Sequence, residues 1–163
     1  MIERQLPATV PNAERLKSRR GRYHIRDPYF CFYFRFLALA FEQPGLSADQ
    51  IWTQIQQDVR AFIGQTAFED LSRQWVLEQG QAGKLPFARE IVGSHWSRQV
   101  QAEVVAVSWR QRAILIGECR WGTDRVDRQV VRDLIEVKVP QVVQELPDAG
   151  AGWTTMPVSR GAV

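Results

Sequence analysis

Two apolar runs in the middle of the chain, joined by a short polar connection, constrain the fold most. They are Gln101–Trp109 and Ala113–Trp121. Continuous apolar runs of this length, bounded by turn residues, are typical of buried β-strands. Each run nevertheless carries charge: Glu103 in the first, and Glu118 and Arg120 in the second. Charges on a buried strand are costly unless they are paired or bound to a metal, so these two strands predict a site.

Apolar periodicity along the rest of the chain predicts an α/β fold with a mixed β-sheet. Asp27 and Ser47 each precede a run with helical spacing, and both residue types are good N-terminal caps. Pro140 is expected to end or kink the last helix, because it has no amide proton and clashes with the preceding turn. Residues 1–20 look irregular. The predicted elements are a short strand at 22–26, helices after Asp27, after Ser47 and over 67–79, strands at about 90–96, 101–109 and 112–121, a turn at 122–124, a helix containing Val130, Leu134 and Val137, and a last strand at 153–158.

Length and cysteine content narrow the class of protein. A chain of 163 residues, with 45% hydrophobic and 24% charged residues, suits one sizeable core. Neither of the longest apolar stretches approaches the roughly 20 residues that span a bilayer, and the N-terminus lacks the apolar core of a signal peptide. Cys31 and Cys119 make neither a disulfide framework nor a metal quartet. We therefore expect a cytoplasmic protein with reduced thiols and no membrane contact.

Positive charge is concentrated at the N-terminus. The net charge is only +3, but residues 1–35 hold eight basic residues against three acidic ones. Basic side chains in such an arm favour contact with nucleic-acid phosphates, where they release condensed counterions. A solvated, flexible tail would have the same composition. The candidate nucleic-acid-binding residues are Arg19, Arg20, Arg22 and Arg26.

The three charges on the apolar strands suggest a specific chemistry. Side chains alternate across a strand, so Glu118 and Arg120 share a face, and Glu103 shares its face with Val105 and Val107. If both faces are on the same side of the sheet, the two glutamates converge, and they then repel unless one is protonated or a cation lies between them. Mg²⁺ prefers such oxygen ligands and can activate a phosphodiester. The alternative is a structural ion pair between Arg120 and one of the glutamates.

Several stretches, taken together, resemble a known family. Gly117–Trp121 stands where that family has Gly-Glu-x-Lys-Trp, and Ala102–Ala106 stands where it has an acid within an apolar strand. The chain resembles the PD-(D/E)XK, or restriction-endonuclease-like, superfamily of nucleases. It is more closely similar to the domain of unknown function that follows the ATPase module in archaeal-type AAA+ ATPases. The likeness covers roughly residues 18–161 and also includes Arg20–Phe30, Phe32–Phe36, Phe68-Glu69 and Ser159–Gly161.

The resemblance implies a restriction-endonuclease-like mixed β-sheet flanked by helices, with an α-helical N-terminal extension. It divides the chain into a basic arm with a winged-helix remnant (1–26), a helical extension (27–66) and a nuclease-like α/β domain (67–163). Glu103 and Glu118 would hold Mg²⁺, and Arg120 stands at the position of the catalytic lysine. Glu69 would be an additional catalytic acid, although an exposed helix charge has the same sequence signature.

Two departures from the family pattern affect the expected function. Glu103 replaces an aspartate, and Arg120 replaces a lysine, which matters more because arginine stays charged and cannot act as a base. Lys138 is expected to lie too far along the last helix to substitute. The chain also lacks a P-loop motif, so it is not expected to bind ATP through one.

We therefore expect a nuclease-like accessory domain of an archaeal-type ATPase that binds nucleic acid, DNA rather than RNA, or a partner, and is weakened in catalysis. The alternatives are a Mg²⁺-dependent DNA endonuclease and a non-catalytic interaction domain. Partners would be an AAA+ ATPase module or a second copy of the chain.

Aromatic and histidine side chains allow a second set of expectations. The aromatic run Tyr29–Phe36 is expected to be core, with room for a partner surface. Trp96 and Trp153 lie near strand ends, where they either pack in the core or stack on bases. His24 and His95 have no second histidine or cysteine at ligand spacing and are expected to be structural or surface residues.

Overall fold

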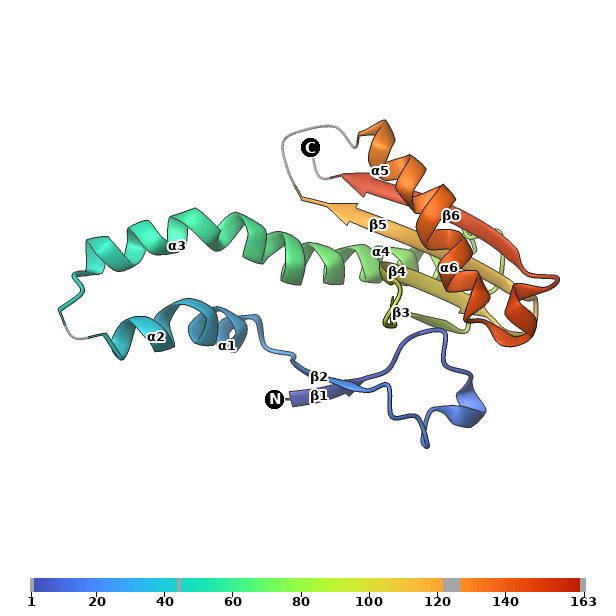
Figure 1. The fold of residues 1–163 in the computed structure, drawn as a ribbon, viewed down its shortest axis with the longest axis horizontal. Helices are drawn as coiled ribbons and strands as arrows, with labels where there is room; N and C mark the ends of the chain where they lie inside the picture. Colours follow the sequence, from blue (N-terminus) through green and yellow to red (C-terminus); the bar gives the residue numbers. More distant parts are fainter. Residues whose placement is uncertain (1, 44, 122–126, 162–163) are drawn as a thin grey trace.

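A four-stranded mixed sheet forms the centre of the computed structural model, which describes residues 2–43, 45–121 and 127–161 (Figure 1). The strand order is β3-β4-β5-β6, in which β3 to β5 are antiparallel and β6 runs parallel to β5. The mixed α/β fold expected from the sequence is therefore confirmed. The turn expected at 122–124 lies outside the described residues. The strands are β3 (Ile91–Trp96), β4 (Gln101–Ser108), β5 (Ala113–Arg120) and β6 (Thr154–Gly161).

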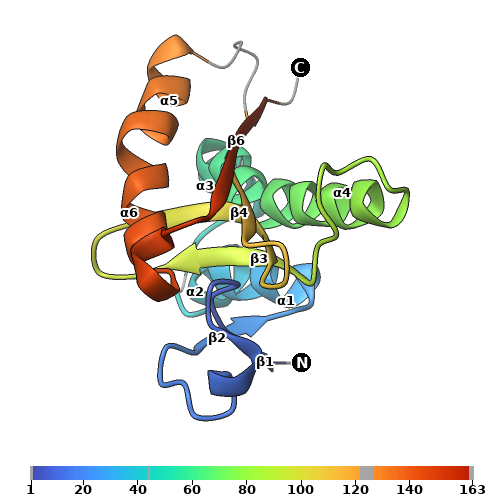
Figure 2. The ribbon, with the colours of Figure 1, turned by 90° about the vertical axis from the view of Figure 1, so that its right-hand side faces the viewer.

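Helices cover both faces of the sheet. Helix α4 (Glu69–Gln81) lies on one face, and α5 (Arg128–Asp133) and α6 (Val139–Gln144) lie on the other (Figure 2). Since β4 and β5 have neighbours on both sides, their apolar runs are buried almost throughout. Toward α5 and α6 the core contains Val105, Val107, Ile114, Ile116, Leu134 and Val142, and toward α4 it contains Phe68, Val76, Val104, Ala106 and Leu115.

The N-terminal segment packs against the edge of this sheet, and the expectation that residues 1–20 are irregular is wrong for residues 2–5, which form a strand. Strand β1 (Ile2–Gln5) pairs antiparallel with β2 (Arg22–Ile25). Between them, the Ala8 N–H donates a 2.8 Å hydrogen bond to the Ser94 carbonyl, and Ala8 belongs to the core. The four residues of β1 include a single aliphatic side chain, so their periodicity gives no signal.

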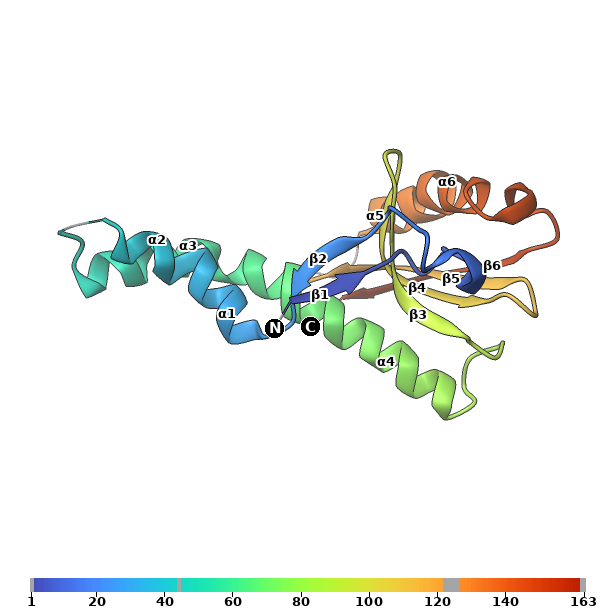
Figure 3. The same cartoon turned by 90° about the horizontal axis from the view of Figure 1, so that it is seen from below.

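A helical arm extends away from the sheet (Figure 3). It comprises α1 (Pro28–Phe32), α2 (Ala38–Phe41) and α3 (Ala48–Ile63). The predicted caps are confirmed: the Asp27 side chain accepts from the Tyr29 N–H, and Ser47 forms a capping box with Gln50. The two halves of the arm meet where Phe32 and Phe36 pack edge-on against Phe62, at centroid distances of 6.1 and 5.3 Å. The rest of the aromatic run is not core as expected, because the side chains of Tyr29, Phe30 and Phe34 are exposed.

Three of the helices are interrupted by a π-helical turn, at Tyr33–Leu37, Gly64–Phe68 and Leu134–Lys138. Each such turn inserts one residue into the helix, a feature frequently found at functional sites. The second turn joins α3 to α4, which the sequence had suggested were separate stretches. The third precedes Pro140, and the helix continues to Gln144 instead of ending there. The wide π-helical turn leaves room for the proline ring, and it tolerates the absence of the proline N–H from the helical hydrogen bonds.

Among the described residues, no helix is both long enough and apolar enough to cross a membrane.

Candidate functional site

Glu103 lies in a β-bulge of strand β4. In the pairing of β3 with β4, Gly93 is opposite Val105 but His95 is opposite Ala102, so β4 has one extra residue here. As a result Ala102 faces the same core as Val105, and the strict alternation assumed for Glu103 is wrong. Bulges re-aim side chains and are over-represented beside active sites.

The Glu103 carboxylate takes part in the sheet itself. The pairing of β4 with β5 extends to Val104 and Gly117, and beyond it Glu103 Oε2 accepts a hydrogen bond from the Cys119 N–H at 2.6 Å. The backbone carbonyl of Glu103 accepts from Arg73 of α4 at 2.8 Å. Glu103 is thereby fixed at the junction between the two central strands and α4.

Glu118 forms a salt bridge with a lysine that the sequence argument had placed out of reach. Lys138 Nζ lies 2.5 Å from Glu118 Oε1, and the two side chains are 31% and 3% exposed. Lys138 closes the third π-helical turn, four residues after Leu134, whose side chain is fully buried against the sheet. The signal in the sequence was this spacing, because residues four apart share one side of a helix. The sequence did not indicate that this side of the helix packs onto β5.

Arg120 does not make the structural ion pair considered above. The partner of Glu118 is Lys138, and Glu103 accepts from a backbone N–H. The Arg120 side chain is exposed at the end of β5. Burial raises the pKa of Glu103, and the positive charge of Arg120 is the weakest of the effects that oppose this rise. Arg120 is therefore near the two acids and open to solvent.

Glu69 approaches the same place from α4. It begins that helix, and its Oε2 lies 3.4 Å from Arg73 Nη1, with its side chain 19% exposed. Burial, and then the charge of Glu103, raise the pKa of Glu69 to about 7 against the opposing effect of Arg73. Glu69 is thus not the exposed helix charge that was its alternative interpretation.

The three glutamates are coupled through Glu103. Burial raises the pKa of Glu103, the Cys119 N–H opposes that rise, and the charge of Glu118 adds to it. Glu103 therefore interacts with Glu69 toward α4 and with Glu118 toward α5 and α6. Carboxylates brought together in this way favour a bound proton or a bound cation.

The donor set suits a hydrated cation. Within the described parts of the chain, no group of three or more His, Cys, Asp or Glu side chains is arranged to hold a metal ion. Mg²⁺ is often bound by one or two carboxylates while it keeps several waters. Glu103 and Glu118 each have one carboxylate oxygen not used in the contacts above, so one oxygen of each is left for such an ion.

The predicted nucleic-acid-binding arginines are only partly brought together. Arg19, Arg20 and Arg22 line one concave surface beside the β3–β4 turn, whereas Arg26, exposed after β2, is not part of its lining. Trp96 is only 9% exposed, and Trp153 packs edge-on against Trp109 at 5.4 Å. For these two tryptophans core packing, not base stacking, is therefore the correct interpretation.

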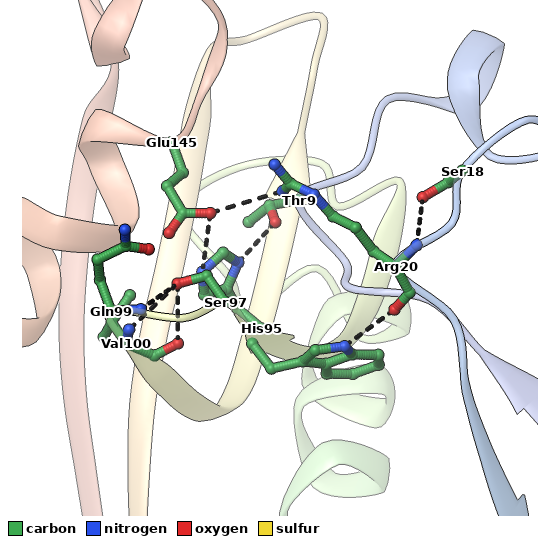
Figure 4. Close-up of polar contacts among 9 residues, drawn as sticks. Thr9, Ser18, Arg20, His95, Ser97, Gln99, Val100 and Glu145 are labelled. Carbon is green, nitrogen blue, oxygen red and sulfur yellow. Dashed lines mark hydrogen bonds and ion pairs between the residues drawn. The ribbon is translucent and has the colours of Figure 1, made fainter.

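A second buried polar cluster holds the N-terminal segment to the sheet (Figure 4). His95 is fully buried; its Nδ1 lies 2.7 Å from Thr9 Oγ1, and its Nε2 lies 3.7 Å from Glu145 Oε2. Burial lowers the pKa of His95, the Glu145 carboxylate opposes this, and Arg20 adds to it. The cluster thus joins the segment before β2, the edge strand β3 and the end of α6 through a neutral imidazole.

Protonation of His95 is expected to destabilise the fold. The pKa of His95 is 6.5 in the unfolded chain and lower in the folded chain. The unfolded chain therefore takes up the proton first, and the folded state loses stability as the pH falls below about 6.5. The variant His95→Gln should therefore lose less stability than the wild type between pH 7.5 and pH 5.5 in urea titrations. His24→Gln, the control at the other histidine, should keep the wild-type pH dependence; equal slopes for all three proteins would refute the assignment.

The fold and site define an α/β domain with a buried acid–lysine pair at the end of its central strands. The chain belongs to a family of archaeal and bacterial proteins of unknown function (DUF234), whose profile matches residues 33–132. It is 32% identical over 139 residues to an uncharacterized protein of Methanocaldococcus jannaschii. That alignment covers 82% of this chain and 29% of the relative, so the chain spans less than a third of the relative's length. No solved structure matches it.

The family match and the site overlap only in part. Residues 33–132 contain Glu69, Glu103, Glu118 and Arg120 but neither Lys138 nor the arginines of the N-terminal segment. The family assignment therefore carries no information on the lysine or on the basic surface.

Proposed function

We propose that this chain is a nuclease-like domain of the restriction-endonuclease-like type that binds nucleic acid and serves as an accessory to an archaeal-type ATPase. One observation carries the proposal: Glu103 and Glu118 occupy the ends of the two central strands, and the Lys138 ammonium lies on Glu118. Two acids with one lysine form a set suited to a phosphodiester, since the acids suit a divalent cation and the lysine suits a phosphate oxygen.

Each side chain of this set has a distinct role. A lysine ammonium has three N–H donors, so Lys138 can hold Glu118 with one and a phosphate oxygen with another. The exposed Arg120 guanidinium is suited to bidentate contact with a second phosphate oxygen. Glu103 and Glu118 would hold Mg²⁺, which, when bound, supplies Lewis-acid activation of the phosphoryl group and of water.

The same geometry argues for weakened catalysis. Glu118 is almost completely buried and already carries a cation, the Lys138 ammonium. While that salt bridge is formed, Lys138 acts as a hydrogen-bond donor and not as a base. Arg120, at the position of the family's lysine, cannot act as a base either. Binding of a phosphodiester is therefore better supported than rapid cleavage.

A Mg²⁺-dependent DNA endonuclease is the second candidate function. Lys138 favours this function specifically. Arg120 stands where a lysine is expected beside Glu118, and Lys138 supplies a lysine to the same acid from the last helix. Release of Lys138 from Glu118 on metal binding would free both groups.

Metal binding and plasmid cleavage separate these functions. Mn²⁺ titration monitored by electron paramagnetic resonance should show one site, with the dissociation constant raised by about tenfold or more in Glu118→Gln, since a deleted ligand has few substitutes. The matched control is Glu136→Gln, an exposed acid that pairs with Arg132 on the helix that carries Lys138. Supercoiled plasmid nicked by the wild type and not by Glu118→Gln would establish the endonuclease. Mn²⁺ binding without nicking supports the accessory domain, and absence of both Mn²⁺ binding and nucleic-acid binding would refute the proposal.

A further inference from the structure

A basic groove lies between the N-terminal segment and the β3–β4 turn. Two adjoining hollows of about 740 and 610 Å³ form it, and they share Arg19, Arg20 and Glu145 as lining residues. We propose that this groove holds consecutive phosphates of a nucleic-acid strand and leads that strand to Glu103 and Glu118. The inference rests on the proposed function and specifies where its ligand binds.

The charge of the groove suits a polyanion. Its basic side chains outnumber the two acids that line it, Glu14 and Glu145, and Glu145 is already engaged by Arg20 at 3.5 Å. Within the described residues, none of the other basic side chains forms a salt bridge with a carboxylate. Arginine guanidinium groups match the geometry of phosphate, and a concave surface suits a single strand better than it suits the plane of a membrane. The basic lining residues are Lys17, Arg19, Arg20, Arg22 and Arg98.

The groove is built before any ligand arrives. Arg20 is fixed at three points: its N–H donates to Ser18 Oγ at 3.2 Å, its carbonyl accepts from Trp96 Nε1 at 3.0 Å, and its guanidinium contacts Glu145 (Figure 4). The Arg22 guanidinium lies over the Trp96 ring, 4.9 Å from its centroid. Trp96 itself is almost fully buried, so the support for both arginines belongs to the core. Donors held in place in this way lose little entropy when they bind.

The groove and the carboxylates lie at the same end of the sheet. Trp96 is opposite Gln101 and Val104 is opposite Gly117, so the β3–β4 turn, the start of β4 and the end of β5 lie at one end. The turn also rises on the side of the sheet that carries α5 and α6, where Lys138 meets Glu118 (Figure 3). Arg98 precedes Glu103 by five residues, a reach of about 17 Å at most. At about 3.4 Å of axis per nucleotide, this corresponds to no more than about five nucleotides of one strand.

Salt-dependent binding tests the groove without involving metal. Fluorescein-labelled 20-nucleotide single strands of DNA and RNA are titrated by anisotropy in EDTA, from 50 to 200 mM salt. The variant Arg22→Ala/Arg98→Ala should bind about tenfold more weakly at 50 mM, and its slope of log K against log salt should be shallower by about 1.4, the value for two lost phosphate contacts on a single strand. The matched control, Arg60→Ala/Arg110→Ala, removes two exposed arginines outside the groove and should bind like the wild type.

The outcomes distinguish the groove from the proposed function. Equal urea midpoints for the two double variants verify that Arg22→Ala has not unfolded the segment; if it has, Arg98→Ala alone, in the turn, replaces it and should reduce the slope by about 0.7. Equal losses in the groove and control variants would overturn the groove while leaving Mn²⁺ binding at Glu118 as the test of function. If the wild type binds neither the DNA strand nor the RNA strand at 50 mM salt, the proposal of the groove is overturned as well.

Discussion

Replacing Lys138 with methionine is expected to lower the free energy of unfolding by about 3 kcal/mol, because it leaves the Glu118 carboxylate buried without its cation. Glu118 is 3% exposed and its ammonium partner lies 2.5 Å away. Breaking a buried pair from one side typically costs about 3–5 kcal/mol, and the lower value applies here because the Lys138 side chain keeps 31% of its exposure.

Urea titration at pH 7 measures this loss. Lys84→Met, at an exposed lysine after α4, is the control and should change stability by less than about 0.5 kcal/mol. The double variant Glu118→Gln/Lys138→Met removes both charges and should regain much of the loss, since no buried charge is left uncompensated. If Lys138→Met is no less stable than Lys84→Met, the salt bridge does not form in solution.

The second large effect is a pH-dependent stabilisation by Glu69→Gln. The pKa of Glu69 is about 7 in the folded chain and 4.5 as a free carboxyl, so the folded state favours its protonated form. The stability contributed by that form is fully present below pH 4.5 and is lost as the pH rises toward 7. A glutamine cannot ionise, and Glu69→Gln should therefore gain about 2 to 3 kcal/mol relative to the wild type between pH 5 and pH 8.

The measurement is the difference in urea midpoint between variant and wild type at each pH. Glu78→Gln, on the exposed side of the same helix, is the control and should give a difference that does not change with pH. Carbon-13 NMR of the Glu69 carboxyl provides an independent check: a titration midpoint near 4.5 would contradict the burial and the coupling to Glu103 described here.

The strands that carry the site could be predicted to within a residue or two, and the reason is physical. Long apolar runs between turn residues have few places to go other than the centre of a sheet, so β4 and β5 were readable. The bulge at Glu103 was not, because an extra residue is defined only by the opposite strand: the strict alternation of one strand cannot show that Ala102 and Val105 face the same core.

Lys138 and the N-terminal strand show the same limit at longer range. The spacing of Leu134 and Lys138 indicated that they share one side of a helix, but nothing local indicated that Glu118 would lie beneath it. Strand β1 depends on a partner about twenty residues away, and Ala8 on a carbonyl of β3. Such contacts are set by the packing of distant segments, which periodicity does not contain.

The third π-helical turn has a consequence for insertions and deletions. One residue in Leu134–Lys138 is surplus to an ordinary α-helix. Its removal would restore an ordinary α-helical turn, with Leu134 and the lysine three residues apart and still on one side of the helix. In homologous chains, a one-residue gap at this place is therefore expected to leave the lysine and its acid paired, so the length of this helix can vary by one residue while the pair is kept.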